Sequence, residues 1–283
     1  MPTTAARRRF VKINSYEIPT PIITKEHGSW AVLLVPILVS AGVAGKWNAA
    51  LLLLVLSSLS FFLAYVPAQL LLRQIIGGGQ MKGKEVRARF WTAGYSCAGA
   101  LFALPLLTRW PLLLAVGALG ILSFLANFFL VRRFSKSIGT DFIAVAGLTL
   151  TGPASYYVLT GLIDRTTIVL YVLNILFFGC SVFYVHMKIR AASMKSTLLP
   201  FADRLFFGRL KLLYYLTIAV ILGILAAMQW MTFVVLAAFT PMIIHGVYGT
   251  ITLSGKVRFK NLGFLLLAQS IVFGLLVPLF VSR

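Results

Sequence analysis

The stretch KEHGSW, residues 25–30, joins a basic N-terminal segment to the first long apolar run of the chain, residues 31–45. It places a base, an acid, an imidazole and an indole within six residues. Counted from Gly28, the run is about long enough to cross the hydrocarbon core of a bilayer as one helix. The stretch therefore marks where the chain enters the membrane.

Composition shows that most of the remaining chain shares this environment. Of the 283 residues, 60% are hydrophobic and only 11% are charged. A soluble domain carries roughly 25% charged residues, so lipid is the expected solvent for this chain. The net charge of +20 lies between apolar runs, which is typical of membrane topology and does not indicate a nucleic-acid groove. We expect no nucleic-acid partner.

Apolar runs of roughly 18 to 24 residues recur along the chain, and backbone groups in lipid require helices. The sequence therefore predicts an all-α, polytopic membrane helix bundle. Four prolines, Pro67, Pro105, Pro153 and Pro241, fall inside or near the interiors of these runs and should kink the helices locally. We expect nine transmembrane helices over 28–45, 49–72, 91–108, 111–131, 139–162, 166–186, 209–228, 230–252 and 262–281.

Basic residues alternate between the two sides of this nine-span arrangement. Of the 26 Lys and Arg residues, four fall on one side and the other 22 on the opposite side. The four are Lys46, Arg109, Arg165 and Arg283. Since cytoplasmic loops carry the excess of Lys and Arg, we expect a multi-pass protein of the cell (inner) membrane, with its N-terminus in the cytoplasm and its C-terminus outside. Residues 1–27 would form a basic cytoplasmic segment and residues 28–283 the transmembrane domain.

The entry stretch holds the first candidate site residues: Lys25, Glu26, His27 and Trp30. In one interpretation they only flank the interface, with Lys25 reaching the headgroups and Trp30 anchoring beside them. In the other, Glu26 and His27 face a cytoplasmic cavity. Adjacent helical residues point to different faces, so that second interpretation requires a non-helical entry to the first span.

A second group of candidates closes the sixth span. His186 and Arg190 are spaced i, i+4 and share a helical face, with Lys188 between them. These bases are suited to an anionic headgroup or a diphosphate, although bases that only reach the interface would give the same pattern. Arg73, which closes the second span, joins this group if spans two and six are neighbours. We predict one cytoplasmic mouth, in which Glu26 provides a counter-charge.

Metal ligands are scarce in the sequence. The six carboxylates form no cluster with metal-ligand spacing, and the three histidines lie far apart. We therefore expect no metal site and no cofactor. The six carboxylates are Glu17, Glu26, Glu85, Asp141, Asp164 and Asp203. Asp141 lies at the start of the fifth span, where a negative charge stabilises the N-terminus of a helix.

Several of these segments resemble one family. Residues 25–31, KEHGSWA, look like the [KR]-[EQ]-H-G-x-W pattern that opens the first span of the YwiC-like family of bacterial integral membrane proteins. Residues 132–136 running into Asp141, residues 152–157 with 160–161, and residues 184–190 are also similar to that family. The resemblance covers most of the chain and implies no established activity.

A more distant likeness is to the UbiA-type prenyltransferases. That resemblance implies nine spans, a cytoplasmic N-terminus and long cytoplasmic connections after spans two and six. Those enzymes hold Mg²⁺ and a prenyl diphosphate with aspartate-rich motifs at the ends of these two spans. Here the corresponding positions, residues 69–74 and 186–190, contain no aspartate. Metal-assisted ionisation of a diphosphate is therefore not expected.

Together these features favour a UbiA-like bundle that binds an anionic amphiphile, a lipid or an isoprenoid phosphate, at the cytoplasmic mouth. Bases would contact the headgroup and apolar helices the tail. A small-solute membrane transporter is the alternative, with Asp141 and His245 as its main interior candidates. A metal-independent transferase is the third possibility, so the sequence leaves open whether the protein is an enzyme.

Overall fold

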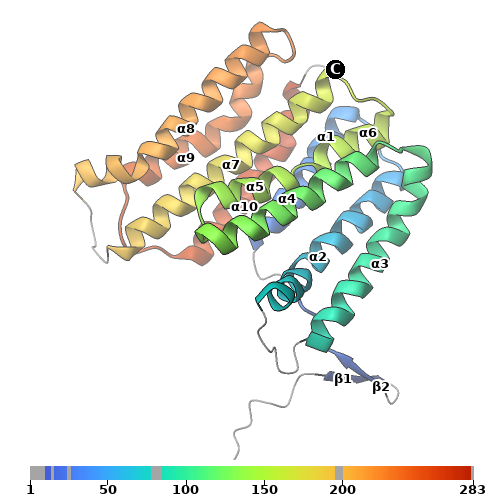
Figure 1. Ribbon diagram of the computed structural model, residues 1–283. Coiled ribbons are helices and arrows are strands. Elements are labelled where there is room, and N and C mark those ends of the chain that lie inside the picture. The colour runs from blue at the N-terminus through green and yellow to red at the C-terminus, as the bar shows by residue number, and fades with distance from the viewer. Residues whose placement is uncertain (1–9, 14–15, 24–26, 78–84, 195–199, 282–283) are drawn as a thin grey trace, which may run out of the picture. The chain divides into compact units, whose positions relative to one another are not determined.

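The computed structural model describes residues 10–13, 16–23, 27–77, 85–194 and 200–281, and these are overwhelmingly helical (Figure 1). Two short strands, β1 (Phe10–Ile13) and β2 (Tyr16–Pro19), pair in an antiparallel hairpin before the first helix. The described chain then continues as α1 (His27–Ala44), α2 (Ala49–Gly77), α3 (Glu85–Arg109), α4 (Leu113–Phe134), α5 (Ile138–Leu148), α6 (Thr151–Thr160), α7 (Arg165–Ser193), α8 (Phe201–Ala227), the 3-10 turn η2 (Phe233–Val235), α9 (Leu236–Ile251) and α10 (Phe259–Phe280).

The all-α membrane fold is confirmed in the described residues. Eight helical segments there are long and apolar enough to cross a bilayer, and α1 adds a shorter apolar helix over Gly28–Ala44. The segments agree with the nine expected runs to within a few residues at most ends. The largest differences are at α3, α7 and α8, which extend further into the polar connections than expected.

One expected span is interrupted. The segment Ile138–Thr160 consists of α5 and α6, which meet at Thr149 and Leu150. Pro153 explains the break, because it has no N–H to donate to the Thr149 carbonyl four residues earlier. The Gly152 amide donates to that carbonyl instead, at 3.0 Å. The interruption expected at Pro153 is therefore present, whereas α2, α3 and α9 continue as single helices through Pro67, Pro105 and Pro241.

Helix ends carry the capping chemistry that their sequence indicates. Ser137 and Thr140 form a reciprocal capping box at the start of α5, and Asp164 and Thr167 form another at the start of α7. Gly161 ends α6 with φ of +76°, a left-handed conformation that glycine adopts without steric cost. These caps fix where α5 and α7 begin.

The chain divides into two compact units, of which the first comprises residues 1–26 and 52–109. Within it, α2 and α3 touch where the Ser57 hydroxyl donates to the Gly99 carbonyl at 2.9 Å and the Phe61 ring lies against Gly99. At the start of α3, the Arg87 guanidinium donates to the carbonyls of Thr20 and Pro21, at 2.5 and 2.9 Å. The chain that follows the hairpin is thereby attached to α3.

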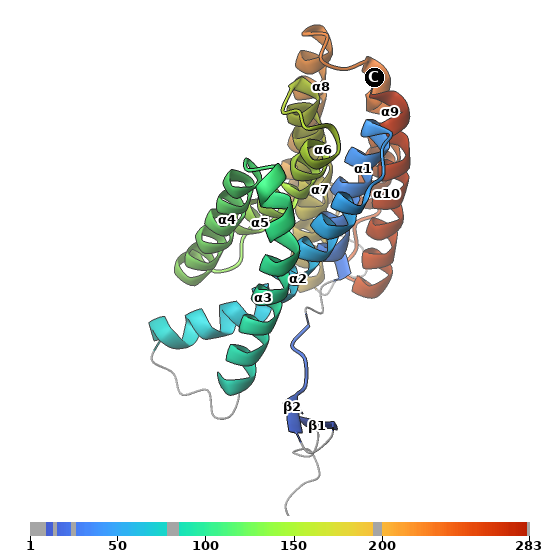
Figure 2. The ribbon, with the colours of Figure 1, turned by 90° about the vertical axis from the view of Figure 1, so that its right-hand side faces the viewer.

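The second unit comprises residues 27–51 and 110–283. Its core centres on α7, which packs against α5, α6, α8 and α1. Phe177 of α7 stacks on Phe273 of α10 with ring centroids 4.0 Å apart, and Phe239 of α9 meets both rings edge-on. Helix α1 lies along α10 and α6, although it is far from both in sequence (Figure 2).

Candidate functional site

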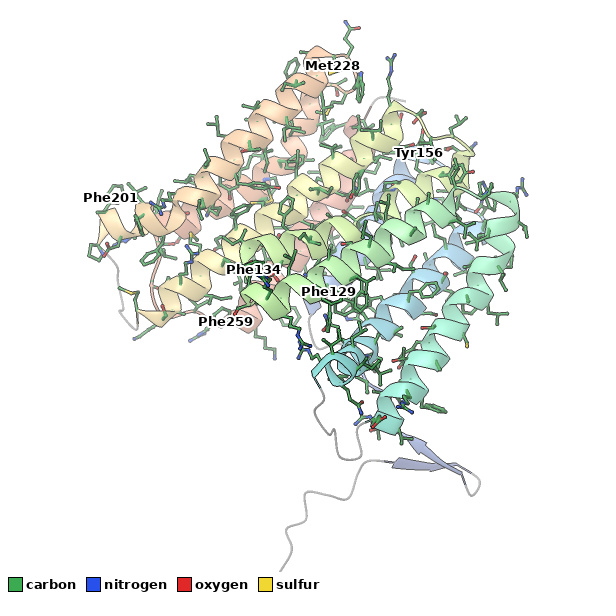
Figure 3. The ribbon with its side chains drawn as sticks, viewed as in Figure 1. Phe129, Phe134, Tyr156, Phe201, Met228 and Phe259 are labelled. Carbon is green, nitrogen blue, oxygen red and sulfur yellow. The ribbon has the colours of Figure 1, made fainter. Side chains whose placement is uncertain are left out.

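One end of the second unit gathers its basic residues, and we call it the basic end. Here α4, α7 and α9 terminate and α5, α8 and α10 begin. Exposed aromatic side chains, Phe134, Phe201 and Phe259, mark it (Figure 3). The described bases of the basic end are Arg132, Arg133, Lys136, Lys188, Arg190, Arg204, Arg209, Lys211, Lys256, Arg258 and Lys260, whereas the opposite end of this unit has Lys46 and Arg165.

A carboxylate and an imidazole meet at the basic end between α5 and α7. The Nε2 atom of His186 lies 2.9 Å from Oδ2 of Asp141, and the two side chains are 16% and 27% exposed. Lys136 places its Nζ atom 3.9 Å from the other carboxylate oxygen. A carboxylate bonded to one ring nitrogen fixes the orientation of the imidazole. Asp141 thus holds His186 and compensates a nearby base.

A small cavity opens beside His186 between α7 and α8. Its volume is about 10 Å³, roughly the space of one water molecule. The walls combine basic with apolar side chains: Ile138, Phe183, His186, Met187, Arg190, Phe207, Leu210 and Lys211. Arg190 is exposed, and its guanidinium has no hydrogen bond or ion pair with any other described residue. The cavity therefore has an apolar wall and, at its mouth, the exposed Arg190 guanidinium, which is unpaired among the described residues.

Lys211 forms the buried side of this cavity. Its residue is only 1% exposed, although lysine is almost never fully buried in proteins. The Nζ atom donates to the Gly246 carbonyl and, at 2.6 Å, to the Thr250 hydroxyl. It also lies 4.7 Å from the centre of the Tyr184 ring, within cation–π range. Every acceptor of this amine is formally neutral.

Lys188 approaches the same aromatic ring from α7. Its Nζ atom lies 5.4 Å from the centre of the Tyr184 ring and donates to the Gly249 carbonyl at 3.1 Å. The Tyr184 hydroxyl in turn lies 3.1 Å from Nε2 of His245. Lys188, Lys211, Tyr184 and His245 thus form one polar cluster inside the bundle, which we call the amine cluster. His245 therefore has a hydrogen-bond partner in this cluster.

Three bases bond backbone carbonyls in the last two turns of α9. Lys211 and Lys188 bond carbonyls at Gly246 and Gly249, and Arg204 donates to the Ile251 carbonyl at 2.7 Å. The last carbonyls of a helix have no intrahelical partner and carry partial negative charge, so cations stabilise this end. A Cβ atom at Gly249 would collide with Tyr184, so glycine is what allows the ring so close to α9.

The structure tests only part of the predicted mouth. His186, Lys188 and Arg190 do lie at one end of the bundle, but they divide: His186 and Arg190 line the cavity, whereas Lys188 turns toward α9. Lys25, Glu26 and the His27 side chain lie outside the described residues, and Trp30 is part of the first turns of α1. Arg73 belongs to the first unit. Its position beside His186 stays a prediction.

Two residues of the candidate site, Asp141 and Lys211, were not among those predicted from the sequence. The sequence indicates Asp141 as a favourable charge at a helix start and as an interior candidate of a transporter, but not as the partner of His186, 45 residues away. Lys211 is one of the 22 bases expected on the cytoplasmic side, but it is buried inside α8. For Lys211 a signal existed, because a lysine within an apolar run usually faces the bundle interior. Within the described ranges, no group of three His, Cys, Asp or Glu residues converges on a metal position.

Comparison with known proteins gives one match. Residues 23–156 match the family described as YwiC-like protein, so the resemblance noted in the sequence is confirmed over that range. The matched range contains α1 to α5, most of α6 and Asp141, and it ends before α7. No curated protein and no solved structure matches the chain. Together with the apolar helices, the match identifies an integral membrane protein whose partner is the lipid bilayer.

Proposed function

We propose that this chain, which is YwiC-like over residues 23–156 and crosses the bilayer repeatedly, binds the anionic headgroup of a membrane amphiphile at the cavity of the basic end. The amphiphile is a lipid or an isoprenoid phosphate. The observation that carries this proposal is the convergence of Arg190 and Lys211 on one cavity with an apolar wall.

Charge supports an anionic ligand. Arg190 offers a planar fork of N–H donors at the mouth of the cavity, a geometry that matches phosphate oxygens. His186 stands one helical turn away, and Lys211 lines the buried side of the cavity. Bases that are already paired with carboxylates would not attract an anion. Here Asp141 is engaged by His186 and Lys136, and Asp203 in the first turn of α8 has no ion pair with Arg190 or Lys211 among the described residues.

Apolar surface beside the cavity supports an attached tail. Leu210 and Phe207 line the cavity, and Phe206, Leu210 and Leu213 are exposed along α8. In a bilayer these exposed side chains face acyl or prenyl chains. A lipid whose headgroup reaches Arg190 could therefore keep its tail on α8 without crossing the polar region.

The proposal also specifies how the chain is oriented across the membrane. Because bases concentrate at the basic end, this end would face the cytoplasm of the cell (inner) membrane, with the N-terminus on the same side and the C-terminus outside. A UbiA-like arrangement of the spans, and one mouth shared with Lys25, Glu26, His27, Trp30 and Arg73, remain part of the proposal.

A small-solute transporter is the second candidate, and one observation favours it. Two polar oxygens, Oγ of Ser40 and Oδ1 of Asn174, are buried in helix interiors without a partner among the described residues. Buried polar atoms are usually satisfied, so unpaired ones are consistent with a passing solute. A metal-independent transferase would use the His186–Asp141 pair beside the bound headgroup.

Lipid analysis separates these candidates. The full chain is extracted gently into nanodiscs or polymer particles, and its co-purifying lipids are identified by mass spectrometry. The proposal predicts enrichment of an anionic phospholipid or prenyl phosphate over the bulk membrane, with less enrichment in Arg190→Ala. Lipid retained at bulk proportions, together with solute flux into proteoliposomes, would instead support the transporter.

A further inference from the structure

Helix α2 is longer than one crossing of a bilayer requires. Its residues 49–66 alone measure about 27 Å as an α-helix, which is close to the thickness of the hydrocarbon core of a membrane. The helix nevertheless continues to Gly77. We call residues 68–76 the α2 arm. Since the crossing is complete before it begins, the arm belongs to the edge of the bilayer.

The α2 arm also changes direction. Figure 1 and Figure 2 show the last turns of α2 running across the direction of its earlier turns. Pro67 directly precedes the arm, and it has no N–H to donate to the Leu63 carbonyl four residues earlier. Loss of that bond is the common cause of a sharp bend in a helix that otherwise continues. A helix that crosses the bilayer before such a bend runs along the membrane surface after it.

The sequence gives the α2 arm two unlike faces. Four large apolar side chains fall within one arc of about 140° around the helix: Leu71, Leu72, Ile75 and Ile76. Outside this arc lie the polar side chains Gln69, Arg73 and Gln74, together with Leu70. Such a division into an apolar and a polar face is typical of a helix that lies in the plane of a membrane interface.

Exposure shows that the apolar face of the arm needs a neighbour of the same kind. Ile75 and Ile76 are 77% and 41% exposed, and Arg73 is also exposed. Two contacts of α2 with α3, at Ser57 and Phe61, lie earlier in the helix. Isoleucine side chains exposed to water are unfavourable by about 25 cal/mol for each Å² of apolar surface. At the edge of the bilayer, acyl chains remove this cost.

We propose that the α2 arm is an interfacial helix and that its partner is the surface of the bilayer. Its leucine and isoleucine side chains enter the boundary between acyl chains and headgroups, while Arg73 extends to the phosphate groups of the lipids. The arm thereby holds the end of α2 at the membrane surface. This role concerns the first unit and does not depend on the cavity beside Arg190.

Spin labels placed one at a time along the arm test this role in the full chain, reconstituted in nanodiscs. Cys97 and Cys180 are first replaced by alanine, so that each label has a single attachment site. Collision rates with oxygen, which concentrates in lipid, and with a water-soluble nickel chelate report the depth of each label. A label at Leu59, halfway along the first part of α2, provides the reference for the hydrocarbon core.

The depths of Leu72 and Ile76 give the first result. We expect labels at these two positions to lie at the same depth, shallower than the label at Leu59. In a helix that continued along the crossing direction, the two positions would differ in depth by about 6 Å. A difference of that size would overturn the inference.

Collision rates around the arm give the second result. Labels at Leu71 and Ile75 should collide mainly with oxygen, and labels at Gln69 and Arg73 mainly with the chelate. Access of the chelate to all four positions would place the arm in water. Low access of both reagents to Leu71 and Ile75 would show that protein, not lipid, covers the apolar face. Either of these results would overturn the inference.

Two matched variants then assign the membrane contact to the apolar face. With the label at Ile76, Ile75→Glu should increase collisions with the chelate, because a carboxylate on that face draws the arm toward water. Gln74→Glu adds the same charge to the polar face and should leave the collision rate unchanged. Equal collision rates in the two variants would contradict an oriented interfacial helix. If Ile75→Glu does not fold, the depths of Leu72 and Ile76 in the unaltered arm decide.

Discussion

Nε2 of His186 lies 2.9 Å from Oδ2 of Asp141, and this contact joins the C-terminal part of α7 to the first turn of α5. It spans 45 residues of sequence and places an oriented imidazole at the edge of the cavity. The pair therefore has two separable roles, one in helix packing and one at the site.

The packing role predicts the behaviour of Asp141→Ala. Removing the carboxylate leaves the half-buried imidazole without its acceptor, which should destabilise the protein by about 1–3 kcal/mol. Thermal unfolding in detergent measures this effect. Asp203→Ala, at the start of α8, is the matched control and should change stability by less than about 0.5 kcal/mol. Equal losses in both variants would show that the pair contributes nothing specific.

Thr250 and Thr252 offer a closely matched comparison in α9 and its C-cap. Both hydroxyls donate to a helix carbonyl, but only Thr250 is buried and accepts from Lys211, at 2.6 Å. Thr250→Val should therefore cost about 1–3 kcal/mol of stability, because the buried amine loses an acceptor. Thr252→Val, which is exposed, should be nearly neutral. The prediction fails if the two valine variants unfold at the same temperature.

Close packing at Gly249 can be tested in the same way. A methyl group there would meet the Tyr184 ring and displace it from its contacts with Lys188 and Lys211, so Gly249→Ala should lower the unfolding temperature by several degrees. Gly223→Ala on α8, where the added methyl meets open space, should be neutral or slightly stabilising. A Gly249→Ala protein as stable as wild type would mean that Tyr184 has room to move.

Much of the fold was predictable because membrane helices follow local rules. Run length and the alternation of Lys and Arg predicted nine apolar segments, and Pro153 predicted the break between α5 and α6. Which helices become neighbours depends on long-range packing that run length does not encode. The contact of α1 with α10 and the pairing of Asp141 with His186 are of this kind.

The site was predictable only in part, for the same reason. His186 and Arg190 share a face by spacing, and the structure places both beside one cavity, whereas the turn of Lys188 toward Gly249 depends on where α9 lies. Lys211 was overlooked because a basic residue near a helix start usually extends to the interface. Its place within an apolar run indicates an interior position, but its acceptors on α9 are set by long-range packing.

The orientation of the chain across the membrane can be tested with reporter fusions. A reporter fused after Arg283 should be periplasmic or extracellular, and one inserted between residues 195 and 199 should be cytoplasmic, because bases concentrate on the cytoplasmic side. Enzymatic reporters active on only one side of the membrane measure both positions. Two reporters found on the same side would contradict the nine-span arrangement.

The central claim is that Arg190 and its cavity bind an anionic headgroup, and the affinity of Arg190→Ala for phosphatidic acid tests it most directly. Loss of one charge-assisted contact should weaken binding about tenfold or more. The matched control is Arg258→Ala at the same end of the bundle, where the side chain is also exposed and lies outside the cavity. The account predicts weakened binding in Arg190→Ala and wild-type binding in Arg258→Ala, with equal unfolding temperatures. Equal affinity in the two variants would contradict it, because the bases of this end would then be interchangeable.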